Sequence, residues 1–455
     1  MTFEPYPTYK ASGVQWIGEA PLGWEVKALK HCIEIPITDG PHETPEFVDS
    51  GMQFISAEAI KNSRIDFERR RGFITNELFF EYSKKCAPRR DDIFMVKSGN
   101  TTGTFAIVET DHAFAIWSPL ALIRVDPKRF SPKFVYYNFA ADFFQENVRI
   151  SCSYGTQPNI GMSVIERLVI SAPPLVDQQS IAKFLDRETA KIDTLIAKQE
   201  AMIDLLKEKR QAVISHSVTK GLDPNVPMKN SGVEWLGDVP KHWTVPPLRA
   251  IAQVVRGASP RPAGDPQFFN GEHTPWVTVG EITKDESMYL VDTSSFLTES
   301  GAANSRLFRA GTLLLSNSGA TLGVPKILAI DGCANDGVVG FERLNESADI
   351  QFVYYYLASL TQNLRERIKQ GAGQPNLNTD LVKEICIGLP PLQEQRQIVV
   401  QLQRAMQRID VLIDKAQQAI ALQKEHRTAL ISAAVTGKID VRSEVAHPVQ
   451  DKEAA

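Results

Sequence analysis

SGVQWIGEAPLGW, residues 12–24, occurs again as SGVEWLGDVPKHW, residues 231–243, half a chain later. Seven of the thirteen positions are identical, and two of these are tryptophans in a chain that has only 6 tryptophans among 455 residues. A residue this rare is not expected to match twice at one offset by chance, so the two stretches indicate an internal duplication. The sequence therefore predicts two copies of one structural unit.

Four further segments recur in the same order and extend the duplication over nearly the whole chain. The offset between copies drifts only from 219 residues at Trp16 and Trp235 to 217 at Pro173 and Pro390, which indicates short insertions and deletions in loops. The segments are PKFVYYNF (132–139) with IQFVYYYL (350–357), GTQPNI (155–160) with GAGQPNL (371–377), APPLVDQQSI (172–181) with LPPLQEQRQI (389–398), and AVISHSVTKGLD (212–223) with ALISAAVTGKID (429–440).

Each half begins with a region of short apolar runs separated by Gly, Asn and Asp, a pattern typical of a strand-rich α+β domain. The runs are 54–60, 105–109 and 120–125 in the first half and 276–282, 311–319 and 337–344 in the second. The paired tyrosines Tyr136, Tyr137, Tyr354 and Tyr355 lie in an aromatic helical setting. We expect them to belong to the core rather than to stack on bases.

Each half then continues into a long helix that follows a double proline. Neither 178–219 nor 393–436 contains Gly or Pro, and Asp177 is placed to cap the first helix. About 40 residues at ~1.5 Å each give a rod of about 60 Å. Residues spaced by 4 and 3 predict a coiled-coil seam in each helix. The seam positions are 181, 185, 188, 192, 195, 199, 202 and 206, and 398, 402, 405, 409, 412, 416 and 419.

A rod of this length cannot bury its seam alone, and its repeat is the expected partner. The alternative, two helices packed separately into ordinary cores, stays open. The second copy of the opening phrase directly follows the first long helix, whereas the first copy has no helix before it. We therefore expect the carboxy-terminal helix to fold back beside Trp16 and complete the same junction.

The predicted fold is α+β, with two strand-rich α/β domains separated by two long helices that form an antiparallel coiled coil, in a pseudo-twofold internal repeat. The boundaries are 1–172 for the first domain (with the repeated segment 9–30), 173–227 for the first helix, 228–389 for the second domain, 390–440 for the second helix and 441–455 for a disordered tail.

Composition is that of an ordinary globular protein, with 43% hydrophobic and 23% charged residues. No apolar stretch approaches a membrane span, and MTFEPYPTYK lacks a signal core, so a cytoplasmic chain is expected. The five cysteines lack CxxC spacing and are expected to be reduced thiols. A net charge of −4 argues against a protein that coats nucleic acid. Locally, however, 61–97 carries ten Lys/Arg against six Asp/Glu, which indicates either a nucleic-acid contact or a solvated face.

With its SGVxWxGxxPxxW phrase, its QPN and PPLxxQ segments and its long helices all repeated in order, the sequence resembles the specificity subunit of type I restriction–modification systems. The resemblance extends to about Val441. It implies that each domain recognises one half of an asymmetric, bipartite target in double-stranded DNA. It also implies that the helices set the spacer and dock two modification (methyltransferase) subunits, with restriction (translocase/endonuclease) subunits joining them. S-adenosylmethionine, ATP and Mg would then be bound by those partners and no cofactor by this chain.

Motifs for catalysis are missing from the sequence. There is no Asn/Asp-Pro-Pro-aromatic motif, no GxxxxGK[ST] loop and no HExxH pair, so we expect a subunit that is not itself an enzyme. Three alternatives stay open: a specificity subunit of a related phage-defence system, a DNA enzyme fused to its own recognition domains, and a coiled-coil scaffold with ligand domains unrelated to DNA.

Candidate DNA contacts lie in loops and basic clusters. The stretches 91–103 and 311–323 align as a strand followed by Ser-Gly and small hydroxyl residues, which suits close approach to a phosphate but also a plain hairpin. The loops 38–42 (TDGPH) and 256–261 (RGASPR) are equivalent yet differ completely, as loops with divergent specificity should. The Gln and Asn of the shared QPN can pair with adenine, but a structural turn or phosphate positioning fits their presence in both halves better.

The basic clusters of the first domain are better suited to phosphates than to bases. The full set of candidates is Thr38, Asp39, His42, Arg69, Arg70, Arg71, Lys84, Lys85, Lys97, Ser98, Asn100, Thr101, Gln157, Asn159, Arg256, Ser259, Arg261, Asn317, Ser318, Thr321, Gln374 and Asn376.

Overall fold

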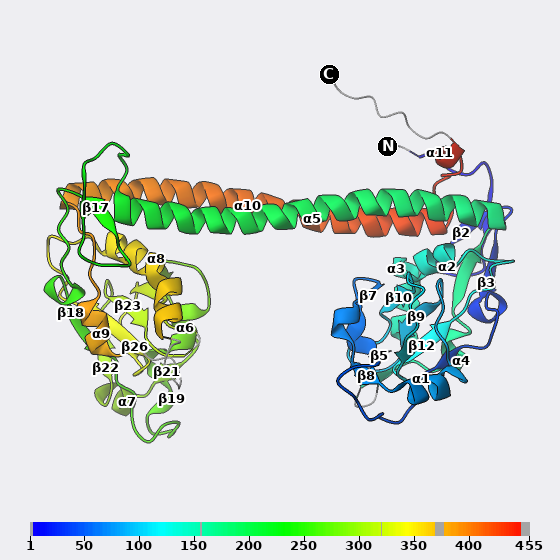
Figure 1. Cartoon of the computed structure of the whole chain (residues 1–455), viewed down its shortest axis with the longest axis horizontal. Coiled ribbons are helices and arrows are strands. Elements are labelled where there is room, and N and C mark those ends of the chain that lie inside the picture. The colour runs from blue at the N-terminus through cyan, green and yellow to red at the C-terminus, as the bar shows by residue number, and fades with distance from the viewer. Residues whose placement is uncertain (1–2, 155–156, 320, 369–376, 447–455) are drawn as a thin grey trace. The chain divides into compact units, whose positions relative to one another are not determined.

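The computed structural model describes residues 3–154, 157–319, 321–368 and 377–446 (Figure 1). The chain forms two compact units, each with one strand-rich domain. The first unit comprises residues 1–200 and 417–455, and the second comprises 201–416. Each unit therefore combines one domain with a stretch of both long helices, α5 (Leu175–Lys220) and α10 (Leu392–Val435).

In the first domain a four-stranded antiparallel sheet, ordered β10-β9-β12-β4, lies beside a three-stranded sheet, β11-β5-β8. All four residues of β9 are buried, as expected for a central strand covered on both faces. The strands are β10 Phe105–Ile107, β9 Ile93–Val96, β12 Leu120–Ile123, β4 Thr38–Asp39, β11 Ala115–Ile116, β5 Met52–Ile55 and β8 Gly72–Ile74, with the pairs β1 Tyr9–Ala11 and β2 Glu19–Pro21, β3 Glu25–Ala28 and β15 Val169–Ala172, β6 Ile60–Lys61 and β7 Arg64–Ile65, and β13 Ser153–Tyr154 and β14 Pro158–Asn159.

The second domain repeats this plan with larger sheets, β18-β26-β23-β24-β20 and β21-β19-β25-β22. The central strand β23 pairs antiparallel with β26 and β24, as β9 pairs with β12 and β10. The strands are β18 Gln253–Arg256, β26 Val338–Glu342, β23 Leu313–Ser316, β24 Pro325–Leu328, β20 Tyr289–Leu290, β21 Phe296–Leu297, β19 Phe269–Val277, β25 Gly332–Ala334 and β22 Arg306–Phe308, with the hairpin β16 Met228–Asn230 and β17 Asp238–Pro240.

The short helices begin at side-chain caps where the sequence supplies them. In α2 the Ser131 hydroxyl accepts a hydrogen bond from the Phe134 amide, and Pro132 occupies the first turn. Besides α5 and α10, the helices are α1 Asn76–Ser83, α2 Pro132–Phe139, α3 Asp142–Ser151, α4 Met162–Ile165, α6 Val279–Thr283, α7 Glu299–Ala303, α8 Ile350–Ile368, α9 Thr379–Glu384 and α11 Ser443–Ala446, with the 3-10 turns η1 Leu29–His31, η2 Ala57–Ala59, η3 Phe67–Arg69 and η4 Leu248–Ala250.

Some local expectations were confirmed and others were wrong. Three of the four tyrosines expected in the core are buried, and Tyr354 is half-buried against the core of the second unit, to which Tyr355 belongs. The apolar runs 54–60 and 276–282 are strands only in part, because each turns into a short helix, η2 or α6.

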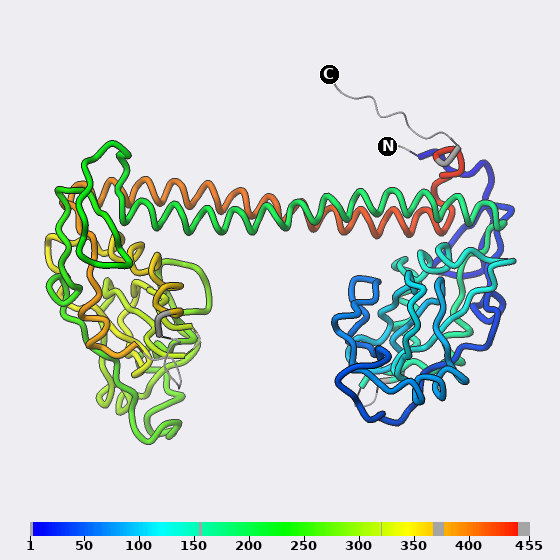
Figure 2. Tube along the Cα trace, viewed as in Figure 1, coloured from blue at the N-terminus to red at the C-terminus, as the bar shows by residue number. Residues whose placement is uncertain are grey.

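The long helices begin and end inside the predicted limits, and they run antiparallel within each unit. Figure 2 shows the traces of α5 and α10 running side by side. In the first unit Asp193 of α5 pairs with Arg427 of α10 at 2.9 Å. The second unit contains an ion pair at matched positions, Arg210 with Asp410. Both residues of one pair lie 217 positions from their counterparts, so one cross-helix contact is made twice and sets the same register in both units.

The predicted seam of α5 was wrong at two of its positions, 195 and 202. Leu195 and Met202 are 46% and 38% exposed, while their neighbours Ile196 and Ile203 are buried. In α10, Leu412 is likewise 43% exposed. Two adjacent apolar residues leave the phase of a heptad ambiguous, and only packing against the partner helix decides which of them faces inward.

Two further expectations about the ends of the helices were wrong. Asp177 is not a cap, because α5 already begins at Leu175 and Asp177 lies within its first turn. The expected disordered tail starts too early, because Val441 is fully buried and Arg442 forms an ion pair with Asp440 at 2.6 Å. Residues 447–455 lie outside the described part of the chain.

The expected return of the carboxy-terminal helix to the opening phrase was confirmed within the first unit. A Cβ on Gly437, just after α10, would lie 2.5 Å from Pro21 and 3.2 Å from the Trp24 ring. In the second unit Gly221, just after α5, takes the same place against Pro240 and Trp243. Trp24 and Trp243 are buried, and Trp16 is 45% exposed, so the second tryptophan of the phrase forms the junction.

The repeated PPLxxQ segment has an equally direct structural cause. Gln178 is buried, accepts a hydrogen bond from the Ser131 amide at 2.9 Å and donates to the Pro173 carbonyl at 2.8 Å. Gln395 makes the matching bonds to the Asp349 amide at 2.7 Å and the Pro390 carbonyl at 2.8 Å. This glutamine therefore ties the start of each long helix to the start of the aromatic helix of its domain.

Candidate nucleic-acid interface

In the first domain the backbone brings together loops that are far apart in sequence. The Lys97 amide donates to the Pro119 carbonyl at 2.8 Å, and the Ser118 amide donates to the Pro41 carbonyl at 3.1 Å. The Gly99 amide donates to the Pro158 carbonyl at 3.1 Å. The early loop, the Ser-Gly loop and the QPN segment thus meet at the carboxyl end of β9.

A buried carboxylate lies at the centre of this convergence. Asp39 is 1% exposed, and its oxygens lie 2.6 Å from Lys85 Nζ, 3.2 Å from Lys97 Nζ and 3.2 Å from His42 Nε2. Burial alone would raise the pKa of Asp39, but hydrogen bonds from Lys85 and Lys97 outweigh burial and hold it below its ordinary value. Asp39 is therefore ionised and orders the basic side chains around it.

These three basic side chains are not equally available to a ligand. The side chain of Lys97 is only 14% exposed, whereas Lys85 and His42 are 52% and 71% exposed. Asp39 and Lys97 thus form the buried base of the site, and Lys85 and His42 lie at its surface. Asn100 and Thr101 are exposed at the tip of the Ser-Gly loop, and Gln157 and Asn159 are exposed beside it.

The remaining basic candidates of the first domain form a separate group. Arg69 and Arg70 lie 3.4 and 3.5 Å from the nearby carboxylates of Asp66 and Glu68, and Arg70 also lies over the Phe73 ring. Arg71 alone reaches the converging loops, because its guanidinium lies 5.4 Å from the centre of the Trp117 ring. Lys84 is exposed at the end of α1. At the edge of the site, these basic side chains are better suited to contacting phosphates than to reading bases.

In the second domain, the candidates of the early loop converge on one residue that the sequence did not single out. Asp336 receives a hydrogen bond from Ser259 Oγ at 2.6 Å and one from Arg261 Nη2 at 3.2 Å, and its carbonyl accepts from Arg256 Nε at 2.6 Å. The hydrogen bond from Ser259 is the main reason that the pKa of Asp336 lies below its ordinary value. Asp336 aligns with Ser118, which lies 218 positions earlier in the first copy of the repeat. This alignment was the only indication in the sequence that Asp336 belongs to the site.

The Ser-Gly loop of the second domain packs closely on the turn that carries Asp336. The Asn317 amide donates to the Gly337 carbonyl at 2.9 Å, and a Cβ on Gly337 would lie 2.7 Å from Ser318 Oγ. Asn317, aligned with Lys97, is 1% exposed and so does not face solvent. Gln374 and Asn376 lie outside the described residues.

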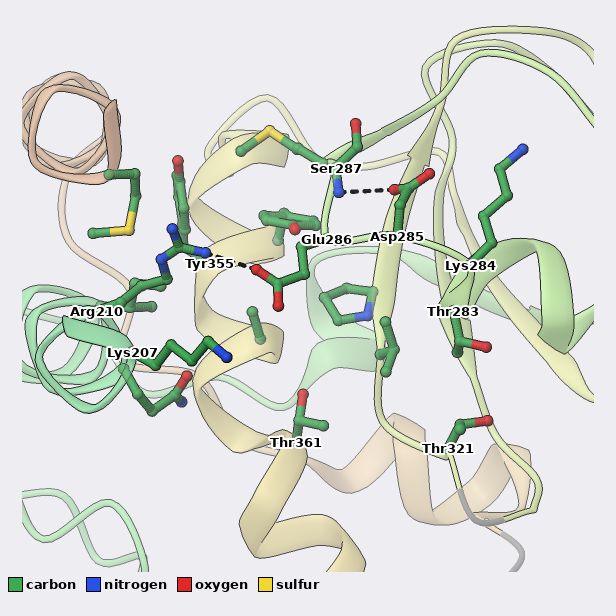
Figure 3. A pocket seen from close by; sticks show the side chains of 18 of the residues that line it. Lys207, Arg210, Thr283, Lys284, Asp285, Glu286, Ser287, Thr321, Tyr355 and Thr361 are labelled. Atoms are coloured by element: carbon green, nitrogen blue, oxygen red, sulfur yellow. Dashed lines mark hydrogen bonds and ion pairs between the residues drawn. The ribbon is translucent and has the colours of Figure 1, made fainter. Parts of the chain in front are cut away.

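A cavity of about 790 Å³ lies within the second unit, where the domain meets α5 and α10 (Figure 3). Arg210 lies 2.7 Å from Glu286 and also pairs with Asp410, so it links both helices to the 283–288 loop. Buried Lys326 holds that loop through Asp285 and the Ser287 carbonyl. Thr321 lines the cavity. The ion pairs of Arg210 join the domain to both helices at this cavity, which favours a structural role for it.

The described parts of the chain contain no group of three His, Cys, Asp or Glu side chains placed to hold a metal ion. None of the described helices is both long enough and apolar enough to cross a membrane. All five cysteines are free.

Comparison with known proteins identifies the family of this fold. The model of the type I restriction modification DNA specificity domain matches twice, at residues 21–204 and 240–420. The chain is 25% identical over 439 residues to the type I restriction enzyme MjaX specificity subunit of Methanocaldococcus jannaschii, with 94% of this chain and 96% of that one covered. It is 20% identical over 457 residues to the EcoKI specificity subunit of Escherichia coli K12, with 95% and 92% covered.

Solved structures show the same fold. A chain from a type I R-M system aligns with a TM-score of 0.72 at 17% identity, covering 92% of this chain and 99% of that one. The HsdS subunit of Thermoanaerobacter tengcongensis aligns with a TM-score of 0.52 at 18% identity, covering 92% and 98%. Because the family model matches both halves over most of their length, the chain belongs to the family of type I restriction modification DNA specificity proteins.

Proposed function

We propose that this specificity subunit reads a bipartite DNA target, with the loops around Asp39 reading one half-site and the loops around Asp336 reading the other. The observation that supports this most directly is the convergence in each domain. An early loop that differs between the two copies meets a Ser-Gly loop that both copies share. A shared loop suits phosphate positioning and a divergent loop suits base reading, which together are what sequence-specific recognition requires.

The long helices then act as the spacer and as the docking surface for two modification subunits. In support, each helix carries residues of both units, and its exposed face keeps large apolar side chains that the coiled coil does not use. These are Val176, Leu195, Met202, Leu205, Val400, Val411, Leu412 and Leu422. Restriction subunits would join the assembly, and the partners would supply the S-adenosylmethionine, ATP and Mg that the reactions need. The complex would act in the cytoplasm, where the DNA is.

A domain exchange tests whether each domain recognises its own half-site independently of the other. Residues 245–388 of this chain are replaced by the matching segment of a relative with a different target, and the methylated sites of a strain carrying the chimera are mapped. We expect one half-site to change and the other to stay, because each unit contains a complete domain with its own core. A change in both half-sites would overturn the division of the target between the two domains.

A further inference from the structure

The second domain holds two guanidinium groups against a single aspartate. Arg261 donates to the Asp336 carboxylate, and Arg256 donates to the carbonyl of the same residue. We propose that Asp336 is a positioning residue that orients Arg256 and Arg261 to read guanine, so that the half-site of the second domain contains at least one G·C pair. This inference rests on the proposed function and deepens it from a reading site to a class of base.

The chemistry of the two side chains favours guanine over the other bases. Guanine presents two acceptors, O6 and N7, side by side in the major groove, and the planar fork of arginine matches them with two parallel hydrogen bonds. Within the described residues, each of these guanidiniums makes one hydrogen bond, and five N–H donors are available on an arginine. Most donors of both groups are therefore left for a ligand.

The surrounding backbone is rigid enough to hold such a pair in place. Arg256 ends β18 and faces Val339 of β26 in the sheet, while the Gly257 amide donates to the Val338 carbonyl at 2.8 Å. The Ala258 amide donates to the Ala334 carbonyl at 2.9 Å. Ser259 Oγ accepts from the Asp336 amide and donates to its carboxylate, which closes a small ring between the two loops. An arginine ordered before binding loses less conformational entropy when it meets a base.

The carboxylate itself is poorly placed to be the reader. Its oxygens already accept from Ser259 and Arg261, and the low pKa of the group keeps it negatively charged. A bare carboxylate next to phosphates is repelled unless a cation accompanies it. Asp336 therefore acts through the arginines, as a fixed acceptor that sets the plane of the Arg261 guanidinium.

The first domain is built differently and gives a comparison inside the same chain. Its central carboxylate, Asp39, is surrounded by two lysines and a histidine, and no arginine of the described part of the chain is bonded to it. A lysine ammonium can also donate to guanine, but it is a point charge without the planar fork that fixes two parallel hydrogen bonds. The guanine prediction consequently concerns the half-site of the second domain alone.

The test uses the chain assembled with its modification subunits. Methylation mapping first gives the target, and binding is then measured on the target duplex and on duplexes with each G·C pair of the second half-site changed to A·T. We expect Arg261→Lys to lower discrimination at one G·C position by roughly 10- to 100-fold. Its affinity for unrelated DNA and its salt dependence should stay as in the wild type, because the charge is kept. Asp336→Asn should weaken discrimination at the same position.

Arg309→Lys is the matched control. Arg309 is an exposed arginine of the same domain that pairs with Asp331 at 2.6 Å, away from these loops, and its replacement should change nothing. A second half-site without any G·C pair would overturn the inference, and so would full discrimination at every position by Arg261→Lys. If the wild-type complex bound the target duplex and the changed duplexes equally well, the proposed function itself would be wrong.

Discussion

At the scale of single residues, the two copies of the opening phrase differ in one hydrogen bond. In the second unit, Trp243 Nε1 donates to Glu394 at 3.0 Å, and His242 lies 2.7 Å from the other oxygen of the same carboxylate. In the first unit, the indole nitrogen of Trp24 is buried and has no partner among the described residues. The residue aligned with Glu394 is Asp177, which is one methylene shorter. A buried donor without a partner destabilises the fold, so the Trp24 indole is less favourable than the hydrogen-bonded indole of Trp243.

Asp177→Glu should therefore stabilise the protein. The longer side chain would reach Trp24 as Glu394 reaches Trp243, and the new hydrogen bond should raise the free energy of unfolding by about 1 kcal/mol. Thermal unfolding measures the change, and Glu394→Asp is the control, since it should lower stability by a similar amount. An unchanged or lower stability for Asp177→Glu would show that the Trp24 donor is satisfied in solution by another route.

The buried Asp39 gives a prediction that depends on pH. Its pKa is lowered in the fold, so its ionised form stabilises the folded state above the unfolded pKa of about 3.9, and that contribution is lost as the pH falls through the folded value. Asp39→Asn removes the counter-ion of a lysine that is only 14% exposed, and it should cost about 3 kcal/mol at neutral pH. The difference between wild type and variant should shrink as the pH falls below the unfolded pKa of about 3.9 and through the lower folded value. Urea unfolding at a series of pH values measures it, and a constant difference would contradict the ion-pair account.

At the scale of elements, the sequence predicted what periodicity and repetition encode. The two long helices, with limits that differ from the predicted ones by two to seven residues, followed from the absence of Gly and Pro. The contact of the second helix with the first domain followed from the repeat, because the second copy of the opening phrase directly follows the first helix. The phase of the seam did not follow, because Leu195 and Ile196 are equally apolar. Only the contact with the partner helix, registered by Asp193 with Arg427, distinguishes them.

The residues of the candidate sites, too, could be predicted from the sequence only in part. In each domain the fold brings the early loop, which differs between the copies, close to the Ser-Gly loop, since the ends of neighbouring strands meet at one edge of a sheet. Asp336 was missed because a lone aspartate in a turn has no local signal, and its partners Ser259 and Arg261 are more than 70 residues away in sequence. Side chains that act through long-range hydrogen bonds can be found only once the strands are paired.

At the scale of the whole molecule, each long helix belongs to both units. Residues 175–200 of α5 lie in the first unit and 201–220 in the second, and α10 is divided the other way round, at 416. The ion pairs Asp193 with Arg427 and Arg210 with Asp410 lie on either side of these division points. Helix length between the two ion pairs is therefore a property that can be changed without touching either domain.

Lengthening both helices by one heptad tests whether they measure the target. Repeating 194–200 after Glu200 and 410–416 after Ala416 keeps the seam in phase and adds ~10 Å to each helix, about three base pairs of duplex. We expect the lengthened variant to prefer targets with a longer spacer while both half-sites keep their sequence, because neither reading loop is altered. Mapping the methylated sites of a strain that carries the variant measures the spacer directly.

The control is the same insertion in α5 alone. It offsets one helix against the other, so Arg210 can no longer meet Asp410 while Asp193 still meets Arg427, and stable assembly should be lost. An active double insertion that keeps the original spacer would show that the distance between half-sites is set by the partner subunits rather than by this chain. A longer spacer with unchanged half-sites would instead show that the lengths of α5 and α10 set the distance between the half-sites. It would also show that this distance is independent of the base sequence that each domain recognises.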